Sequence, residues 1–375
     1  MNQALYSHAL FFDPLDRKVE WSKIDRNLNR IPYAKEEKGA QALEDGGIRF
    51  HFFAPAANAV KVAGLMGREY DMHRREDGYW TVDVHDIPPG FHYHHYVVDG
   101  VSTTNPLTAY GYGGFQPVNF LEVPDPSFDA YLLREVPHGS IRMEHYESKV
   151  TGRTRCCWVY TPPGYDSNIQ KRYPVLYLQH GGGENETGWI WQGKINYLID
   201  NLLAEGKCKE MIVVMNSGYA FKDEETSDFL PGDFDSVLTQ DCIPFIERQF
   251  RVLTDRDSRA MAGLSMGAYQ TLHTAFKHLE LFAWIGMFSG SMEHKGHGLF
   301  DHRERFADGE AFNSQVKLLF LAMGEQEGGY EPIVRQYEEL RTLGIACTLY
   351  TCPGYHDWTV WRKSAYELLQ RLFQA

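Results

Sequence analysis

Residues 258–276 read SRAMAGLSMGAYQTLHTAF, and this stretch decides the fold. SRAMA suits a short buried strand and AYQTLHTAF suits a helix, with Gly263-Leu264-Ser265-Met266-Gly267 between them. This is a G-x-S-x-G motif in the strand–turn–helix setting of a nucleophile elbow. Its glycines are needed because the turn is tight and neighbouring backbone passes close to the serine. The motif predicts that Ser265 lies at the C-terminal edge of a sheet, with its hydroxyl exposed as a nucleophile.

Around this motif, the chain after about residue 140 alternates between strand and helix patterns. Apolar runs that suit strands buried on both faces are YPVLYLQ (173–179), EMIVVMN (210–216), LFAWIGMF (281–288), VKLLFLAM (316–323) and IACTLYTC (345–352). Helical periodicity appears at 195–203, at about 332–343 and at about 357–373. This alternation predicts an α/β fold, a doubly wound and mostly parallel sheet with helices on both faces.

A nucleophilic serine needs a base that accepts its proton, and a third group that orients this base. His356 stands in PGYHDW (353–358), directly after the run IACTLYTC, on the last strand-to-helix loop. The chain order in α/β-hydrolases is Ser, acid, His, so this loop is where the base belongs. We therefore predict that His356 is the base and that His180 braces its own glycine-rich loop.

The acid is expected after the run VKLLFLAM, where the chain reads GEQEGG (324–329). This loop offers two carboxylates, Glu325 and Glu327, and Asp357 beside the histidine is a third. The acid accepts the second N–H of the base and stabilises the imidazolium, which Glu can do as well as Asp. We favour Glu327 and keep the other two as alternatives.

A run of glycines follows the first buried strand of this region, in the sequence QHGGGE (179–184). Such a run leaves backbone N–H groups bare, and these can point at an oxyanion. The N–H of Met266, directly after the predicted nucleophile, would be the second donor. A phosphate-binding loop is excluded because no Gly-Lys-Ser/Thr follows the glycines.

Aromatic residues make up 14% of the chain, and several of them border the predicted cleft. Trp189, Trp191 and Gln192 come within ten residues after the glycine run. Other loops at the same sheet edge carry Tyr219, Phe221 and Trp358. Flat aromatic walls suit an aromatic ring or the face of a sugar, whereas a long aliphatic chain needs a wide groove. Trp191, Gln192 and Trp358 are therefore predicted substrate contacts, with core packing as the alternative.

The first third of the chain has a different pattern. Short alternating segments, separated by Pro-Gly and Asp-Gly turns, are IRFHFFAP (48–55), AVKVAGLM (59–66), YWTVDV (79–84) and FHYHHYVVDG (91–100). These segments predict an antiparallel, immunoglobulin-like β-sandwich. We expect three parts: an extension at 1–40, the sandwich at 41–130 and the α/β domain at 131–375.

The composition narrows the class of partner. The 375-residue chain has 37 Lys and Arg against 50 Asp and Glu, a net charge of −13, which argues against a nucleic-acid partner. No run of about 18 apolar residues is present, so no membrane span is expected. No basic and then apolar leader starts the chain, which indicates a cytoplasmic protein, or a secreted one if a signal was removed. The six cysteines have no C-x-x-C spacing and are expected to be reduced, and a homo-oligomer is left open.

Two polar clusters have the residue types of metal sites but are expected to be solvated. His92, His94 and His95 share one strand, and residues 223–225 (DEE) form an acidic loop. We expect neither to bind a metal, and no metal or organic cofactor is implied elsewhere.

The segment from about 137 to 375 resembles the esterase D and enterochelin-esterase-like family of α/β-hydrolases, which includes the feruloyl and acetylxylan esterases of carbohydrate esterase family 1. The matching stretches are VYTPPGY (159–165), YPVLYLQHGGGENETGWIWQGK (173–194), IVVMNSG (212–218), RAMAGLSMG (259–267) and GYHDW (354–358). Residues from about 48 to 124 resemble an early-set, family 48 carbohydrate-binding-like sandwich, through FHFFAPAANAVKV (50–62), GYWTVDV (78–84) and PPGFHYHHYVVDG (88–100).

The resemblance implies a serine esterase. Its implied site residues are the triad Ser265, His356 and Glu327, with oxyanion donors at Gly182 and Met266. Two positions depart from the family. Ala268 replaces the last glycine of the usual motif, and Glu327 takes the place of the usual aspartate, one methylene longer.

The implied substrate is a small-molecule or oligosaccharide ester, namely feruloyl or acetyl esters of plant-polysaccharide fragments. A catecholate siderophore ester is the alternative, and a carbohydrate-binding protein without catalysis is the non-enzyme alternative. The sandwich is expected to pack against or gate the catalytic domain, with independent glycan binding as the other use.

Overall fold

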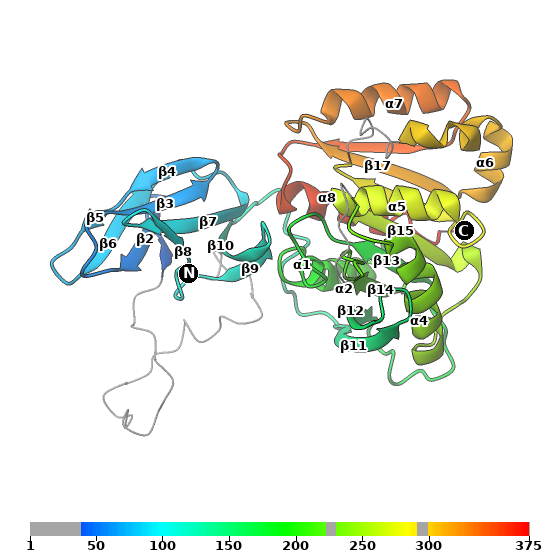
Figure 1. Ribbon diagram of the computed structural model, residues 1–375, viewed down its shortest axis with the longest axis horizontal. Coiled ribbons are helices and arrows are strands. Elements are labelled where there is room, and N and C mark those ends of the chain that lie inside the picture. The colour runs from blue at the N-terminus through cyan, green and yellow to red at the C-terminus, as the bar shows by residue number, and fades with distance from the viewer. Residues whose placement is uncertain (1–38, 223–229, 291–298, 375) are drawn as a thin grey trace. The chain divides into compact units, whose positions relative to one another are not determined.

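The computed structural model describes residues 39–222, 230–290 and 299–374. The expected N-terminal extension and the acidic cluster at 223–225 therefore lie outside the described residues, except for the last two residues of the extension. The described residues divide into two compact units, one within residues 39–129 and one within residues 130–374 (Figure 1). Each unit has a hydrophobic core of its own, which is the physical mark of a separate domain.

Two antiparallel sheets form the first unit. One contains, in spatial order, β1 (Ala40–Ala42), β2 (Ile48–Phe53), β6 (Tyr79–Val84) and β5 (His73–Arg74). The other contains β4 (Arg68–Asp71), β3 (Val60–Leu65), β7 (Gly90–Val98), β10 (Gln116–Val123) and β9 (Tyr110–Gly113), and β8 (Val101–Thr103) pairs with β7. Phe50 of β2 and Val62 of β3 meet in the core between the sheets. The predicted β-sandwich is confirmed.

The three histidines on β7 were expected to lie on a solvated face, but one of them, His94, is buried. His94 is 1% exposed, and its ring meets the ring of Phe50 edge-on, with 5.3 Å between the centroids. Burial lowers the pKa of His94 to about 3, so its ring is neutral. His94 shares a strand face with Tyr96, two residues further on, which is also buried. The expectation is wrong because it weighted polarity above the two-residue period of a strand.

An eight-stranded sheet forms the centre of the second unit, within the described residues. Its spatial order is β11 (Ser140–Ser148), β12 (Arg153–Thr161), β14 (Ile212–Asn216), β13 (Val175–Gln179), β15 (Arg259–Leu264), β16 (Trp284–Phe288), β17 (Leu318–Gly324) and β18 (Thr348–Cys352). Strand β12 is antiparallel to both of its neighbours, and every other pairing is parallel. The predicted α/β-hydrolase sheet is confirmed, and the carboxyl ends of its parallel strands meet at one edge.

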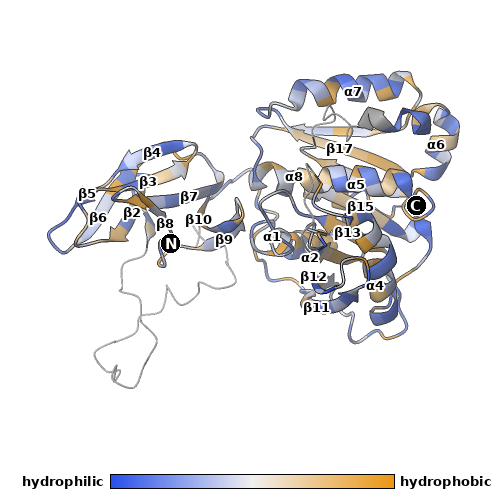
Figure 2. Ribbon diagram, viewed as in Figure 1, coloured by the Kyte–Doolittle hydropathy of each residue, from blue (hydrophilic) through white to orange (hydrophobic). Residues whose placement is uncertain are grey.

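Helices cover both faces of this sheet. One face carries α1 (Gly188–Trp191), α2 (Ile195–Ala204) and α8 (Trp358–Leu369), and the other carries α4 (Ile243–Gln249), α5 (Met266–Lys277), α6 (Gly309–Gln315) and α7 (Tyr330–Thr342). Short turns at Phe234–Ser236 (α3) and Val237–Cys242 lead into α4. The central strands are hydrophobic, whereas α5 and α7 each carry a hydrophobic and a hydrophilic side (Figure 2). This pattern is what buries the sheet on both faces.

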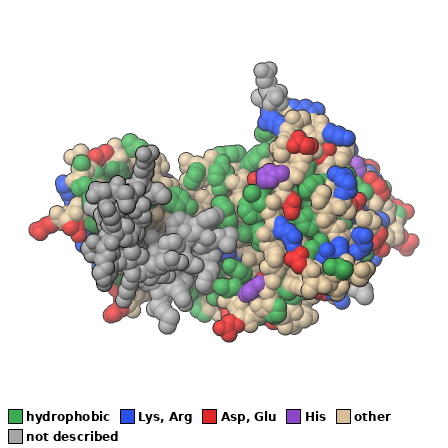
Figure 3. All heavy atoms as spheres, turned by 90° about the horizontal axis from the view of Figure 1, so that it is seen from below, with side chains coloured by type: hydrophobic (Ala, Val, Ile, Leu, Met, Phe, Trp, Pro, Cys, Tyr) green, Lys and Arg blue, Asp and Glu red, His purple; other side chains and the backbone are tan. Residues whose placement is uncertain are grey.

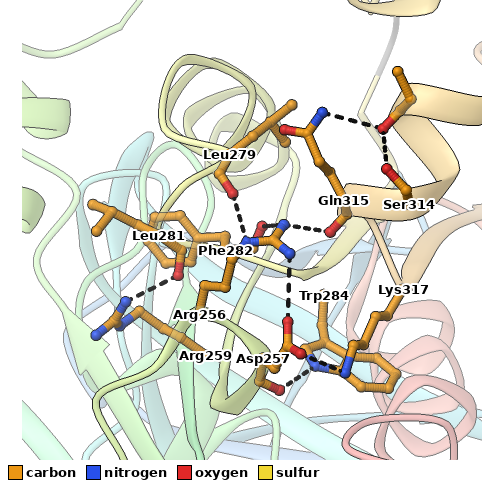
Figure 4. A network of polar contacts seen from close by, with 11 residues as sticks. Arg256, Asp257, Arg259, Leu279, Leu281, Phe282, Trp284, Ser314, Gln315 and Lys317 are labelled. Atoms are coloured by element: carbon orange, nitrogen blue, oxygen red, sulfur yellow. Dashed lines mark hydrogen bonds and ion pairs between the residues drawn. The ribbon is translucent and has the colours of Figure 1, made fainter. Parts of the chain in front are cut away.

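Figure 4 shows a network of polar contacts between side chains and backbone groups near the amino ends of β15, β16 and β17. This edge of the sheet is opposite the one that carries Ser265. Arg256, in the turn before β15, donates hydrogen bonds to three carbonyl oxygens that belong to Leu279, Phe282 and Gln315. Asp257 pairs with Lys317, just before β17, with 2.8 Å between Oδ2 and Nζ. The carbonyl of Asp257 accepts a hydrogen bond from Trp284 Nε1, at the start of β16. These contacts fix the register of β15, β16 and β17 at their amino ends.

Several whole-chain features can be stated for the described residues. All six cysteines are free, as predicted. Basic and acidic side chains are interspersed over the second unit on the face seen in Figure 3. No described helix has both the length and the apolar character needed to cross a bilayer. No group of three or more described His, Cys, Asp or Glu side chains is placed to hold a metal ion.

Candidate active site

Ser265 stands between β15 and α5 in a backbone conformation that few L-residues adopt. Its φ is 51° and its ψ is −120°, and such strain costs about 1–3 kcal/mol. Two glycines permit the turn. A Cβ at Gly263 would lie 2.4 Å from the carbonyl oxygen of Gly267, and one at Gly267 would lie 2.5 Å from that of His180. The turn is therefore the tight elbow that the motif predicts, at the carboxyl edge of the sheet.

Three of the predicted side chains lie in one hydrogen-bonded row. Ser265 Oγ is 3.0 Å from His356 Nε2, and His356 Nδ1 is 2.7 Å from Glu327 Oε2. The parallel sheet brings them together, because they follow β15, β18 and β17 at the same edge. The His356 side chain is 49% exposed, whereas that of Glu327 is 4% exposed. This arrangement fits a histidine whose Nδ1–H donates to the carboxylate while Nε2 accepts from the hydroxyl.

Further groups hold the carboxylate of Glu327. Its Oε1 accepts hydrogen bonds from Ser289 Oγ at 2.6 Å and from the Gly324 N–H at 2.8 Å. Ser289 Oγ in turn accepts from Trp361 Nε1 at 3.0 Å. The Trp361 ring meets the His356 ring edge-on, with 5.1 Å between the centroids. Ser289, Gly324 and Trp361, which we name the acid brace, thus fix the longer glutamate side chain beside the histidine.

The two alternative acids have other contacts. Glu325 is exposed, and its Oε1 lies 3.5 Å from Thr351 Oγ1. Asp357 caps α8, because its Oδ1 accepts a hydrogen bond from the Thr359 N–H at 2.8 Å. The structure therefore brings Glu327 to His356.

The glycine loop after β13 comes close to the elbow. A Cβ at Gly181 would lie 3.2 Å from Ser265 Cβ, and one at Gly182 would lie 3.9 Å from Met266 Cβ. Gly182 is exposed, and among the described residues neither its N–H nor that of Met266 has a hydrogen-bond acceptor. Two bare donors beside a serine hydroxyl can stabilise the negative charge that develops on a carbonyl oxygen.

His180 braces this loop, as predicted. Its Nδ1 donates to the Gly181 carbonyl at 2.8 Å, and its Nε2 accepts from the Gly218 N–H at 2.8 Å. The ring is 1% exposed, and burial lowers its pKa to about 4. A neutral ring keeps both hydrogen bonds, so His180 ties the loop after β13 to the loop after β14.

The prediction that three side chains contact substrate is wrong for two of them, because both are buried. Gln192 and Trp358 are both 0% exposed, so a ligand that enters from solvent cannot touch them. Trp358 Nε1 donates to Glu184 Oε1 at 2.9 Å, and its ring packs edge-on against Trp189, which is 1% exposed. These side chains belong to the core between α1, α8 and the sheet. Trp191 is partly exposed and stays a candidate contact.

Sequence reasoning missed Ser289 and Trp361. Ser289 directly follows the buried strand β16, with a φ of 52°, and a polar residue at that point is a signal that could have found it. Trp361 lies on α8, one turn after the loop that carries His356. Its role depends on how α8 packs, which no local pattern specifies.

Comparisons with known proteins match a different family model to each unit. Residues 148–328 match the Esterase family model, and residues 37–110 match the model of carbohydrate-binding module 48, the isoamylase N-terminal domain. The second unit therefore has the α/β-hydrolase fold and is similar to the Esterase family over most of its length, and the first unit is similar to carbohydrate-binding module 48.

Individual relatives point the same way. An endo-1,4-beta-xylanase/feruloyl esterase of Xylanibacter ruminicola is 36% identical over 340 residues, which cover 88% of this chain but only 45% of that protein. A CE1 ferulic acid esterase from Anaeromyces mucronatus, solved with ferulic acid, is 27% identical over 65% of this chain and 94% of its own, with a TM-score of 0.56. An enterobactin esterase from Shigella flexneri, 17% identical with a TM-score of 0.63, covers 89% of this chain and 95% of its own, and shows the fold alone. The chain thus spans less than half of the first relative's length.

Proposed function

We propose that this chain is a serine carboxylic-ester hydrolase. The observation that carries the proposal is the row Ser265 Oγ, His356 Nε2 and Nδ1, and Glu327 Oε2, with spacings of 3.0 and 2.7 Å. A strained elbow presents the hydroxyl, and bare N–H groups lie beside it at Gly182 and Met266. A nucleophile, a base, an orienting acid and two oxyanion donors are the groups that acyl transfer needs.

The reaction follows from these positions. Ser265 Oγ attacks the ester carbonyl while His356 Nε2 takes its proton, and the oxyanion accepts hydrogen bonds from the two backbone N–H groups. Glu327 stabilises the imidazolium. His356 then protonates the departing alcohol, which leaves an acyl-serine. In the second half, His356 takes a proton from water and the hydroxide attacks the acyl carbon. The bond to Ser265 Oγ then breaks, Oγ takes the proton back from His356, and the acid is released.

The substrate class we propose is feruloyl or acetyl esters of plant-polysaccharide fragments. The similarity to a xylanase/feruloyl esterase and to a CE1 ferulic acid esterase supports it. Methyl ferulate, an acetylated xylo-oligosaccharide and a catecholate trilactone form the panel that tests it, ranked by kcat/KM. The trilactone ranking first would replace this substrate class with a siderophore ester.

The nucleophile is tested by Ser265→Ala. We expect kcat on methyl ferulate to fall by about 10³-fold or more, because triad serines act as one unit with their base. The matched control is Ser314→Ala, an exposed serine on α6, which should retain wild-type kcat. Retention of more than about a tenth of kcat in Ser265→Ala, with the fold intact by circular dichroism, would reject the assignment.

A further inference from the structure

A cavity of about 290 Å³ lies at the same sheet edge as Ser265. Its walls come from the start of β12, from the chain after the glycine loop and from the loop after β14. These segments meet there because β12 runs antiparallel to β14, which places Cys157 opposite Asn216 and the start of β12 beside the end of β14. Nothing in the proposed triad or oxyanion site uses this space.

The wall of the cavity is built on the loop that carries the oxyanion donor. The Cβ of Ser265 approaches Gly181 and that of Met266 approaches Gly182, whereas the N–H of Gly183 donates to Tyr219 Oη at 2.8 Å. Tyr219 lines the cavity. Three successive residues thus connect the reacting serine to the cavity, so a substrate longer than one ring can occupy both.

Three charged side chains line this space, namely Arg153, Arg155 and Glu186. Arg155 is 9% exposed and donates through Nη1 to the Tyr219 carbonyl at 2.9 Å and through Nη2 to the Ser217 carbonyl at 2.7 Å. Glu186 lines the same cavity, and no ion pair joins it to a described cation. A carboxylate without an ion-pair partner favours a ligand that donates hydrogen bonds to it.

The composition of the walls indicates the ligand. An exposed donor at Arg153 and an acceptor at Glu186 suit the hydroxyls of a polyol. Tyr219 and Phe221 add aromatic surface that suits the C–H face of a sugar ring. An aryl acyl group would need walls that are predominantly apolar. The volume, about 290 Å³, lies just below the roughly 300–1,000 Å³ of pockets for drug-sized ligands, which suits a single ring.

We propose that this cavity is a glycosyl subsite, which binds one neutral sugar unit of the ester substrate beside the reacting carbonyl. The inference rests on the proposed esterase function and adds to it a site for the carbohydrate part of the substrate. Recognition of that part would then come from the catalytic unit itself.

The test compares two esters with the same acyl group, methyl ferulate and a feruloylated arabinoxylan trisaccharide. The measured quantity is the ratio of kcat/KM for the sugar ester to kcat/KM for the methyl ester. Glu186→Gln should lower this ratio about tenfold, the effect of losing one hydrogen bond to a charged group. Phe221→Ala should also lower it. The matched control is Glu338→Gln, an exposed glutamate on α7, which should leave the ratio at the wild-type value.

Two outcomes would overturn the subsite. If Glu186→Gln and Phe221→Ala leave kcat/KM unchanged on both esters, the sugar does not bind in this cavity. If both variants lower kcat/KM equally on the two esters, the ratio is unchanged and the cavity binds the acyl group instead. Calorimetric titration of the trisaccharide into Ser265→Ala, with and without Glu186→Gln, tests the subsite without turnover, and equal affinity contradicts it. A wild type that hydrolyses neither ester would reject the proposed function, whereas the titration would still decide the subsite.

Discussion

Glu327 carries one methylene more than an aspartate at the same place, and a longer side chain has more rotamers to lose when it is fixed. The acid brace answers this need. Ser289 and Gly324 both donate to Oε1, which leaves Oε2 for His356. The carboxylate therefore has only one orientation in which all of its partners are satisfied. The orientation of the base is set by residues that never reach the substrate.

Replacing the acid by its amide tests this assignment. Glu327→Gln should lower kcat by up to about 10⁴-fold, because an amide leaves the histidine in the wrong tautomer. Glu325→Gln, two residues earlier on the same loop, is the matched control and should change kcat little. Steady-state kinetics on methyl ferulate measures both. The reverse ranking would assign the acid to Glu325, and two mild variants would require another carboxylate.

At the residue scale, the sequence predicts those site residues whose positions follow from the order of strands and loops along the chain. Ser265 follows from its motif, and His356 and Glu327 follow from their places after the last two strands, because parallel strands end at one edge. The prediction that Gln192 and Trp358 contact the substrate is wrong for a physical reason. Nearness in sequence to a catalytic loop does not specify whether a side chain points into the cleft or into the core, and both of these are fully buried.

At the element scale, β7 shows how a strand sets the charge state of a side chain. His94 lies on the core face beside Phe50 and Tyr96, and burial depresses its pKa from 6.5 to about 3. The two-residue period of the strand places His94 on the same face as Tyr96, which is buried. The β-pattern of the first unit and the α/β alternation of the second were predictable for the same reason, since both are periodic over whole elements.

The depressed pKa of His94 makes stability depend on pH. The unfolded chain binds a proton at this histidine below about pH 6.5, whereas the folded chain binds it only near pH 3. The contribution of neutral His94 to the free energy of unfolding is therefore complete above about pH 6.5 and is lost as the pH falls toward 3. Thermal unfolding followed by circular dichroism from about pH 7 to about pH 4 should therefore show a falling Tm. His94→Leu should flatten this fall, and an equal slope in both proteins would contradict the role of His94.

At the scale of the whole molecule, the chain is two units with separate cores. Phe50 belongs to the core of the first unit, and the triad lies wholly in the second. Scanning calorimetry should therefore resolve two transitions. Phe50→Leu should lower the Tm of only one of them and leave kcat on methyl ferulate at the wild-type value. A single transition that the variant shifts as a whole would show that the units unfold together.

The polar network at the amino ends of β15, β16 and β17 has a consequence for how this fold can change. It anchors the strands at the end that no substrate reaches, and the reacting groups stand on loops at the other end. Loops at the carboxyl edge can therefore be exchanged or lengthened without unfastening the sheet. A designer who grafts loops at that edge should therefore keep Arg256, Asp257 and Lys317 unchanged.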